Sequence, residues 1–338
     1  MHEILVTGGA GYIGSHTCIS LIKAGYSVVI ADDLSNSRYE VISRIQEISG
    51  KKVSFYAYDV SDELELENIF QRHSIECVIH FAGKKAVGES VSIPLDYYRT
   101  NLNTTISLCR VMQRYNVRKF VFSSSAAIYG LSDKVPFTED SPHGACTSPY
   151  GWTKCMNEQI LRDLCISDPT WSVQILRYFN PVGAHSSGRI GEDPRGLPNN
   201  LMPYITQVAV GKLKKLSIYG ADYPTPDGTG VRDYIHVMDI AEGHVASVKK
   251  CLSENGVQVY NLGTGIGYSV FDILHAFEKT IGRTLPFEIV PRRDGDTAVS
   301  FAETKMAENE LGWKSVRDLQ EMCNDSWKWQ SENPNGYE

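Results

Sequence analysis

The sequence predicts an α/β protein with a doubly wound parallel sheet and a smaller C-terminal lobe. Over the first half of the chain, short apolar runs alternate with segments of helical periodicity, which is typical of buried parallel strands joined by helices. Glycines and polar residues directly follow several of these runs, at the sheet edge where a doubly wound fold gathers its functional groups. Beyond about residue 180 the alternation stops, and glycine, proline and asparagine become more frequent.

Length and composition are those of an ordinary globular protein. The 338 residues are enough for two domains, and the net charge of -7 argues against broad binding of nucleic acid. No apolar run approaches the length of a membrane span, and the strand expected at Glu3–Thr7 leaves no room for a signal peptide. The eight cysteines stand singly, without metal-ligand spacing, so we expect reduced thiols, no metal site and a cytoplasmic protein.

The chain opens with a strand, a glycine turn and a helix. The apolar run Ile4–Thr7 leads into the glycines of Gly8–Gly14, and helical spacing then continues over Ser15–Ala24. Glycines allow a tight turn and let backbone N–H groups approach a pyrophosphate, which the positive end of the helix attracts. A glycine cluster by itself is weak evidence, because many such turns bind nothing.

The second strand supports a dinucleotide site. It spans Val28–Ala31 and ends in Asp32 and Asp33, where a Rossmann-type fold places the acid that accepts hydrogen bonds from the adenosine ribose. A carboxylate at this position repels a 2′-phosphate, so we expect NAD and not NADP. The complete order of strand, turn, helix, strand and acid favours this interpretation over a solvated turn.

The remaining elements extend the same pattern. We expect further parallel strands at 53–58, 77–81, 119–123 and 172–177, and helices at 64–73, 101–115 and 150–164. In the second lobe we expect helices at 201–211, 239–252 and 269–282 and a strand at 257–261. Residues 1–180 are therefore assigned to a Rossmann domain, with later returns near 231–263, and residues 181–338 mainly to the lobe.

Tyr150 and Lys154 lie four residues apart at the start of an expected helix, so their side chains project from one face. A free tyrosine has a pKa of about 10, and a neighbouring cation lowers that pKa, which makes the pair a candidate base. Two such residues are more often amphipathic side chains on a helix surface. The catalytic interpretation therefore depends on the surrounding motifs, of which Ser125 after a strand is one.

Seven segments carry a resemblance to a known family. They are Val6–His16, His80–Ser90, Phe122–Gly130, Ser148–Gly151, Arg177–His185, Asn199–Pro203 and Gly228–His236. Together they resemble the extended short-chain dehydrogenase/reductase superfamily, and within it most closely the UDP-galactose 4-epimerases, also called UDP-glucose 4-epimerases. The glycine turn and the Tyr-x-x-x-Lys pattern are general to the superfamily, whereas the last three segments are far more specific. The likeness covers nearly the whole chain.

The resemblance implies two sets of binding residues. The NAD-binding set is Gly8, Gly11, Tyr12, Ile13, Gly14, Asp32, Asp33, Asn36, Ser37, Asp59, Val60, Phe81, Ala82, Gly83, Lys85, Asn101, Tyr150, Lys154 and Phe179. The set at the UDP-sugar is Ser125, Tyr150, Asn180, Asn200, Leu201, Tyr219, Arg232, Tyr234, Arg293, Asp296 and Ser300. Independently, Arg232 and Arg293, each in a turn of an acidic protein, suit a doubly charged diphosphate. The resemblance also implies a homodimer formed by the helices at 101–115 and 150–164.

The implied reaction is an NAD-dependent isomerisation of UDP-glucose and UDP-galactose at C4 through a 4-keto sugar. As phenolate, Tyr150 would take the proton of the 4-hydroxyl, Ser125 would bridge that hydroxyl and Tyr150, and Lys154 would hold the phenolate and the nicotinamide ribose. The keto sugar would then turn about its diphosphate link. The anchoring contacts therefore belong on the uridine diphosphate, and the sugar pocket must be loosely specific.

The chain departs from the family pattern at two positions. The family often has an asparagine pair before the helix that follows Gly88, whereas this chain has Thr100 and Asn101, which puts a cofactor contact from position 100 in question. At the position of Ser300, a tyrosine in the family narrows the sugar pocket and a small residue leaves room for an N-acetyl group. We therefore hypothesise activity on UDP-N-acetylglucosamine and UDP-N-acetylgalactosamine. The alternative is that Ser300 is only a local packing choice.

Two other functions remain open. A related sugar-nucleotide 4,6-dehydratase or decarboxylase begins with the same oxidation at C4, but it typically carries an acid after the serine or threonine, whereas Ser125 is followed by Ala126 and Ala127. A non-catalytic NAD-sensing regulator could use the same fold. Such a regulator would not need Ser125, Tyr150 and Lys154 together.

Overall fold

The computed structural model describes residues 2–132, 134–293 and 296–338. Its centre is a seven-stranded sheet in which every neighbouring pair is parallel. In spatial order the strands are β10 (Gly256–Leu262), β6 (Ser172–Tyr178), β5 (Lys119–Ser125), β4 (Ile75–His80), β1 (Glu3–Thr7), β2 (Ser27–Ala31) and β3 (Ser54–Tyr56). The chain order reverses between β1 and β4, which is where a doubly wound sheet opens its binding crevice.

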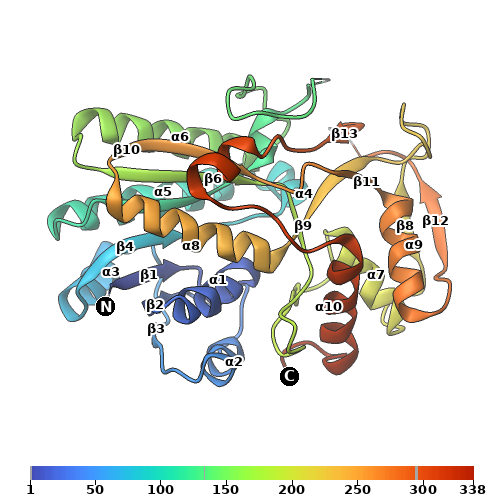
Figure 1. Ribbon diagram of the computed structural model, residues 1–338, viewed down its shortest axis with the longest axis horizontal. Coiled ribbons are helices and arrows are strands. Elements are labelled where there is room, and N and C mark those ends of the chain that lie inside the picture. The colour runs from blue at the N-terminus through green and yellow to red at the C-terminus, as the bar shows by residue number, and fades with distance from the viewer. Residues whose placement is uncertain (1, 133, 294–295) are drawn as a thin grey trace.

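Helices cover both faces of this sheet (Figure 1). On one face lie α1 (Tyr12–Lys23), α2 (Glu40–Ser49) and α8 (Val237–Ser253), and on the other lie α3 (Glu63–Arg72), α5 (Pro94–Arg114) and α6 (Pro149–Ser167). Successive residues along a strand point to opposite faces of the sheet and so belong to different hydrophobic cores. In β1, for example, Val6 packs with the first set of helices and Leu5 with the second. The inner strands β1, β2, β4, β5 and β6 are therefore buried on both faces, which explains their apolar sequences, and the arrangement confirms the predicted α/β class.

Some element boundaries differ from the predicted ones. α5 begins at Pro94 and not near residue 101, because proline is well suited to the first position of a helix. A short helix, α4 (Val87–Ser92), precedes it, and a 3₁₀ turn, η1 (Ala126–Tyr129), follows β5. Neither α2 nor α4 was predicted, and β3 is shorter than the expected strand at 53–58.

The C-terminal lobe is built on two small sheets. One contains β7 (Asn180–Val182), β9 (Val231–His236), β11 (Gly267–Ser269) and β13 (Val299–Ser300), and the other contains β8 (Leu216–Tyr219) and β12 (Phe287–Val290). The helical elements are α7 (Leu201–Ala209), α9 (Val270–Ile281), the π-helical turn η2 (Ala307–Leu311) and α10 (Leu319–Glu332). Ile205, Phe277 and Met322 belong to a hydrophobic core of the lobe's own.

The chain passes between the two parts more than once. β7 follows β6 and pairs with β9 of the lobe, α8 then returns to pack on α1, and β10 completes the main sheet. Of the returns expected near 231–263, α8 and β10 thus join the layers of the main sheet, whereas β9 lies in the lobe; the division at residue 180 stays a prediction. None of the helices in the described part of the chain has the length and apolar character that a bilayer crossing requires.

Candidate active site

The glycine turn between β1 and α1 lies against the end of β4. Gly8 has a φ of +70°, and a Cβ there would stand 2.7 Å from the backbone nitrogen of Ala82. A Cβ at Gly14 would stand 2.3 Å from the carbonyl oxygen of Gly8, so side chains are excluded at both positions. No described side chain caps α1, whose N-cap residue is Gly11. Among the described residues, no side chain therefore covers the backbone N–H groups at the start of α1, and this arrangement fits the pyrophosphate of NAD.

The two acids after β2 have different surroundings. Asp32 is buried, and its carboxylate accepts hydrogen bonds from the backbone N–H of Ala10 (3.0 Å) and from Ser37 Oγ (2.7 Å). Burial raises the pKa of Asp32, and these hydrogen bonds oppose the rise. Asp33 is exposed and accepts hydrogen bonds from Ser35. Asp32 thus braces the glycine turn, whereas Asp33 is the more accessible acceptor for a ribose.

Asn101 comes from a helix, α5, behind the sheet edge. Many of the other predicted cofactor residues lie at the start of α1 or just beyond the ends of β2, β3 and β4, namely Ile13, Asn36, Ser37, Asp59, Val60, Phe81, Ala82, Gly83 and Lys85. Asn101 Oδ1 accepts a hydrogen bond from the backbone N–H of Lys84 at 2.8 Å. Its Nδ2 donates to Lys84 O at 3.0 Å and to Thr153 Oγ1 at 2.9 Å. Asn101 therefore holds the loop after β4 against α6 and acts on the cofactor site through that loop.

β5 and α6 bring Ser125, Tyr150 and Lys154 into one cluster. β5 ends at Ser125, and α6 begins after Ser148, whose hydroxyl accepts a hydrogen bond from the backbone N–H of Gly151 at 3.2 Å. The side chain of Ser125 lies beside the hydroxyl of Tyr150 and favours the ionised form of this phenol. Lys154 Nζ lies 5.8 Å from the ring centre of Tyr150. The helix start and the strand end are thus what place the three side chains side by side.

Burial controls the ionisation of Tyr150 and Lys154. It raises the pKa of Tyr150, and Ser125 opposes the rise. Burial also lowers the pKa of Lys154 to about 8, although Glu158 favours the charged form, and Lys154 Nζ donates a hydrogen bond to the carbonyl oxygen of Ser123 at 2.6 Å. The protein's own groups therefore do not lower the pKa of Tyr150 as the sequence predicted, because burial raises this pKa by more than Ser125 lowers it.

A buried ion pair lies beneath this cluster and was not predicted. Arg177 Nη2 donates to Glu158 Oε2 at 2.7 Å, and Ser124 Oγ donates to Glu158 Oε1 at 2.6 Å. Both charged side chains are almost fully buried. Glu158 lies one helical turn after Lys154, a spacing that could have indicated its role, whereas its partner on β6 could not be read from the sequence. The pair fixes α6 on the ends of β5 and β6.

Five of the predicted nucleotide residues form a group in the lobe. The Asp296 carboxylate lies between two arginines, 2.9 Å from Arg293 Nε and 3.7 Å from Arg232 Nη2. The guanidinium of Arg293 lies 4.9 Å from the ring centre of Tyr219. Tyr234 is buried beside the same charges, and burial raises its pKa to about 12. Two cations held in one place suit recognition of a diphosphate.

The remaining predicted residues lie between this group and the main sheet. They are Phe179 and Asn180 around the start of β7, Asn200 and Leu201 at the start of α7, and Ser300 on β13. Ser300 pairs with Arg232 in the sheet register, so it lies beside the charged group. Asn200 Nδ2 donates to Glu192 Oε1 at 2.8 Å, a contact that was not predicted. Residues 294 and 295 of the predicted basic turn lie outside the described residues.

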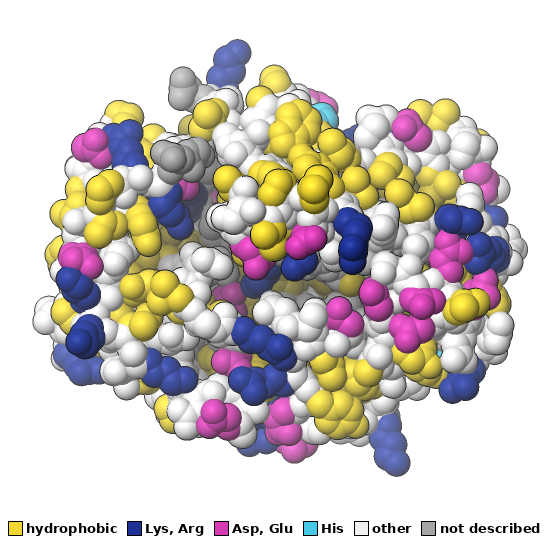
Figure 2. Space-filling view, turned by 180° about the vertical axis from the view of Figure 1, so that it is seen from behind, with side chains coloured by type: hydrophobic (Ala, Val, Ile, Leu, Met, Phe, Trp, Pro, Cys, Tyr) yellow, Lys and Arg dark blue, Asp and Glu magenta, His cyan; other side chains and the backbone are white. Residues whose placement is uncertain are grey.

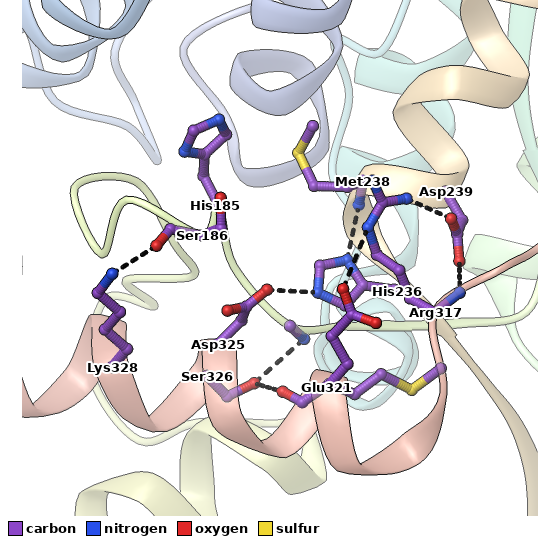
Figure 3. Close-up of polar contacts among 12 residues, drawn as sticks. His185, Ser186, His236, Met238, Asp239, Arg317, Glu321, Asp325, Ser326 and Lys328 are labelled. Carbon is purple, nitrogen blue, oxygen red and sulfur yellow. Dashed lines mark hydrogen bonds and ion pairs between the residues drawn. The ribbon is translucent and has the colours of Figure 1, made fainter.

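α10 fastens the segment that follows β7, as Figure 3 shows. Ser326 Oγ accepts a hydrogen bond from the backbone N–H of Gly183 at 3.1 Å, and Asp325 Oδ2 lies 3.2 Å from His236 Nε2. The hydroxyl of Tyr12 donates to the carbonyl oxygen of Gly183 at 2.7 Å. Tyr12, a predicted cofactor residue, thus links α1 to the strand that carries Asn180, and sequence patterns could not indicate contacts between such distant residues.

Comparisons with known proteins span both the sheet edge and the lobe. The family model described as GDP-mannose 4,6 dehydratase matches residues 5–326. UDP-glucose 4-epimerase from Bacillus subtilis (strain 168) is 60% identical over 99% of this chain and 98% of its own. The crystal structure of UDP-glucose 4-epimerase from Bifidobacterium longum in complex with NAD+ and UDP has a TM-score of 0.96 at 52% identity and covers 99% of both chains. A Stenotrophomonas maltophila UDP-glucose-4-epimerase with bound NAD and formylated UDP-arabinopyranose has a TM-score of 0.96 at 49% identity, again over 99% of both chains.

Proposed function

The chain belongs to the family of UDP-glucose 4-epimerases and carries out NAD-dependent epimerisation of UDP-glucose, and from this premise we infer which of its residues do the chemistry. The observation that carries the inference is the cluster formed by the end of β5 and the start of α6, in which Ser125 lies beside Tyr150 and Lys154 Nζ lies 5.8 Å from the ring centre of Tyr150. Lys154 lies on the next turn of the same helix. A phenol, a hydroxyl and an ammonium at one sheet edge are what proton removal from a sugar hydroxyl requires.

Tyr150 acts as the base in this proposal. It takes the proton from the 4-hydroxyl of the sugar, and Ser125 hydrogen-bonds both oxygens during the transfer. Lys154 stabilises the phenolate by its charge, which offsets the burial that raises the pKa of Tyr150. NAD, when bound at the glycine turn, supplies a hydride acceptor and donor for C4. Ser125, Tyr150 and Lys154 thus handle the proton.

The lobe anchors the diphosphate. Arg232 and Arg293 share Asp296 in the structure, and in the complex they would hold the two phosphates while the 4-keto sugar turns about its link. Asn180 would contact the sugar, and Asn200 and Leu201 would contact the uridine diphosphate. Because the anchor lies away from C4, either face of the sugar can meet the same base.

The direct test is a coupled assay in which purified protein converts UDP-galactose to UDP-glucose, and the reverse, without added oxidant. Tyr150→Phe is the control, and it should remove turnover. A dehydratase would release a product lighter by one water, and an NAD-sensing regulator would show no interconversion. Either of those results would overturn the proposal.

We propose that the same pocket also accepts UDP-N-acetylglucosamine and UDP-N-acetylgalactosamine. Ser300 is a small residue beside Arg232, and it leaves space where a bulkier side chain would narrow the sugar pocket. The Stenotrophomonas maltophila relative was crystallised with a formylated UDP-sugar, which is consistent with room for a substituent in this family.

Ser300→Tyr tests this specificity. We expect it to lower kcat/KM for the acetylated sugars at least about tenfold, because a steric mismatch in a pocket costs roughly this much. The plain sugars should be affected by less than about threefold. Ser300→Ala, which keeps the space, is the matched control. Equal kinetics of wild type and Ser300→Tyr on the acetylated sugars would contradict the proposal.

A homodimer and a cytoplasmic location complete the proposed function. Exposed apolar side chains stand on the outer helices, including Val91 on α4 at 62%, Leu95 on α5 at 80% and Ile166 on α6 at 79%, and Figure 2 shows apolar side chains gathered in patches on the face seen from behind. Such side chains support pairing of α5 and α6 with their mates, which sedimentation velocity would test. All eight cysteines are free thiols, which supports a reducing compartment.

A further inference from the structure

Glu192, on the segment between β7 and α7, joins two residues of the proposed site. Its Oε1 accepts hydrogen bonds from Lys85 Nζ at 3.1 Å and from Asn200 Nδ2 at 2.8 Å. Lys85 follows β4 on the cofactor side, whereas Asn200 precedes α7 on the nucleotide side. The side chain of Glu192 is only 9% exposed. Its carboxylate is therefore held between the two parts of the site and not in open solvent.

The backbone around Glu192 is clamped by the C-terminal segment. Trp329 Nε1 donates to the carbonyl oxygen of Glu192 at 3.2 Å, and the hydroxyl of Tyr337 donates to the carbonyl oxygen of Gly191 at 2.9 Å. A Cβ at Gly191 would stand 2.3 Å from the ring of Trp329, so this packing requires glycine. The carboxylate is thus presented from a fixed stretch of chain, as a residue that orients others must be.

Glu192 also faces the glycine turn. It lines a small cavity together with Tyr12, Gly183 and Met202, and its charge adds to the effect of burial in raising the pKa of Tyr12. Asn200 is the N-cap residue of α7 but makes no capping hydrogen bond, and its side-chain Nδ2 donates to Glu192 instead. One carboxylate therefore joins the loop after β4 to the start of α7 and lies in the same small cavity as Tyr12 at the start of α1.

We propose that Glu192 is a positioning residue that sets the spacing between the NAD side and the UDP side of the site. The inference rests on the proposed function, in which Lys85 contacts the cofactor and Asn200 the uridine diphosphate. A sugar that turns about its diphosphate must bring C4 to the same place from either face, so the distance between the two anchors matters. The shared oxygen ties both donors to one point. Removing its charge frees Lys85 and loosens the start of α7.

Glu192→Gln tests the role, since it keeps the size of the side chain and one acceptor but removes the charge. We expect the Kd of UDP, measured by calorimetry, and the KM of UDP-galactose to rise about tenfold, because hydrogen bonds to a charged group are the stronger class. The value of kcat should change by less than about twofold, and the NAD content of the purified protein should be unchanged. A purely structural residue would lower the melting temperature without this split between KM and kcat.

Glu47→Gln is the matched control. Glu47 on α2 pairs at 2.6 Å with Arg189 on the same segment as Glu192, but both side chains of this pair are exposed, so we expect neither the Kd nor the KM to change. In a double-mutant cycle, Asn200→Ala should remove most of the effect of Glu192→Gln, because the two side chains act through one contact.

Three results would overturn the role of Glu192. These are a Kd of UDP in Glu192→Gln within twofold of wild type, an equal change in Glu47→Gln, and fully additive effects of Glu192→Gln and Asn200→Ala. Calorimetry with UDP requires no turnover, so the outcome is separate from that of the proposed reaction. The reaction fails instead if wild-type protein does not interconvert UDP-glucose and UDP-galactose.

Discussion

The sheet edge and the lobe hold their functional groups in different ways. At the sheet edge, Asp32 and Lys154 are almost fully buried and are hydrogen-bonded to backbone atoms of neighbouring elements. In the lobe, the side chain of Arg293 is 54% exposed and Tyr219 is 40% exposed. Arg232 and Arg293 there each form an ion pair with Asp296, so the charged groups are held mainly by one another.

This difference follows from what each region must do. Hydride and proton transfer at C4 tolerate little error in position, so the base belongs on a rigid frame of parallel strands and a capped helix. In the proposed mechanism the diphosphate is the pivot about which the sugar turns, so its anchors need charge more than rigidity. Short strands such as β8 and β12 are enough to carry them.

Tyr150→Phe should have the largest effect, because it removes the proton acceptor from the rigid region. We expect kcat to fall about a thousandfold, within the range that general base catalysis supplies. The KM of UDP-galactose should stay within about threefold, since the lobe still binds the nucleotide. Steady-state kinetics in the coupled assay measure both values.

The control for Tyr150→Phe is bound cofactor, measured by NAD released on denaturation, together with the far-ultraviolet circular dichroism spectrum. Both should match the wild type, because the ring that packs at this position is retained. A variant that keeps wild-type kcat would remove Tyr150 from the mechanism.

Arg232→Met should have the next largest effect, and this effect should be on KM and not on kcat. Arg232 is the less exposed arginine, at 19%, so we expect the loss of its charge-assisted hydrogen bonds to raise the KM of UDP-galactose about 10- to 100-fold. Arg293→Met, at the more exposed position, should raise the KM only about threefold, as is usual for solvated charges. Calorimetric titration with UDP checks both values without turnover.

If the two arginine variants raise the KM of UDP-galactose equally, the exposed fraction of each arginine side chain does not determine how much it contributes to binding. A large fall in kcat for Arg232→Met, with little change in KM, would instead place Arg232 with the rigid region. Melting temperatures should agree within a few degrees, because neither side chain belongs to a hydrophobic core.

The rigid region was the easier one to predict from the sequence. Strands buried on both faces are read as apolar runs, so β1, β2, β5 and β6 and the residues after them could be placed directly. The glycine turn could be interpreted because its backbone packs so closely that a side chain at Gly8 or Gly14 would collide with neighbouring backbone atoms. Helical spacing places Tyr150 and Lys154 on one face, and the surrounding motifs were needed to interpret the pair as catalytic.

Contacts between distant segments could not be predicted. Glu192 meets Lys85 and Asn200 through folding, and α10 reaches Gly183 in the same way, so no local pattern encodes either contact. The pKa of Tyr150 depends on burial, which spacing does not report, and for this reason its direction was predicted incorrectly. In the lobe, the arginines were identified from family resemblance, whereas the bridging geometry of Asp296 required the structure.

An effect smaller than those of Tyr150→Phe and Arg232→Met comes from pH, and it separates the two regions without a mutation. Burial lowers the pKa of Lys154 to about 8 from its ordinary value of 10.5, whereas arginine does not titrate in this range. The charge of Lys154 is therefore present below pH 8 and lost as the pH rises through 8, so kcat should fall about fivefold between pH 8 and 9 while the KM of UDP-galactose stays constant. Stability should move the other way, because between pH 8 and 10.5 the unfolded chain holds the proton that folded Lys154 has released, so this residue's contribution to the unfolding free energy increases with pH. In Lys154→Arg, the activity that remains should show no decrease of kcat near pH 8. If the decrease persists in this variant, another group is titrating, and the ionisation of Lys154 is not what distinguishes the sheet edge from the lobe.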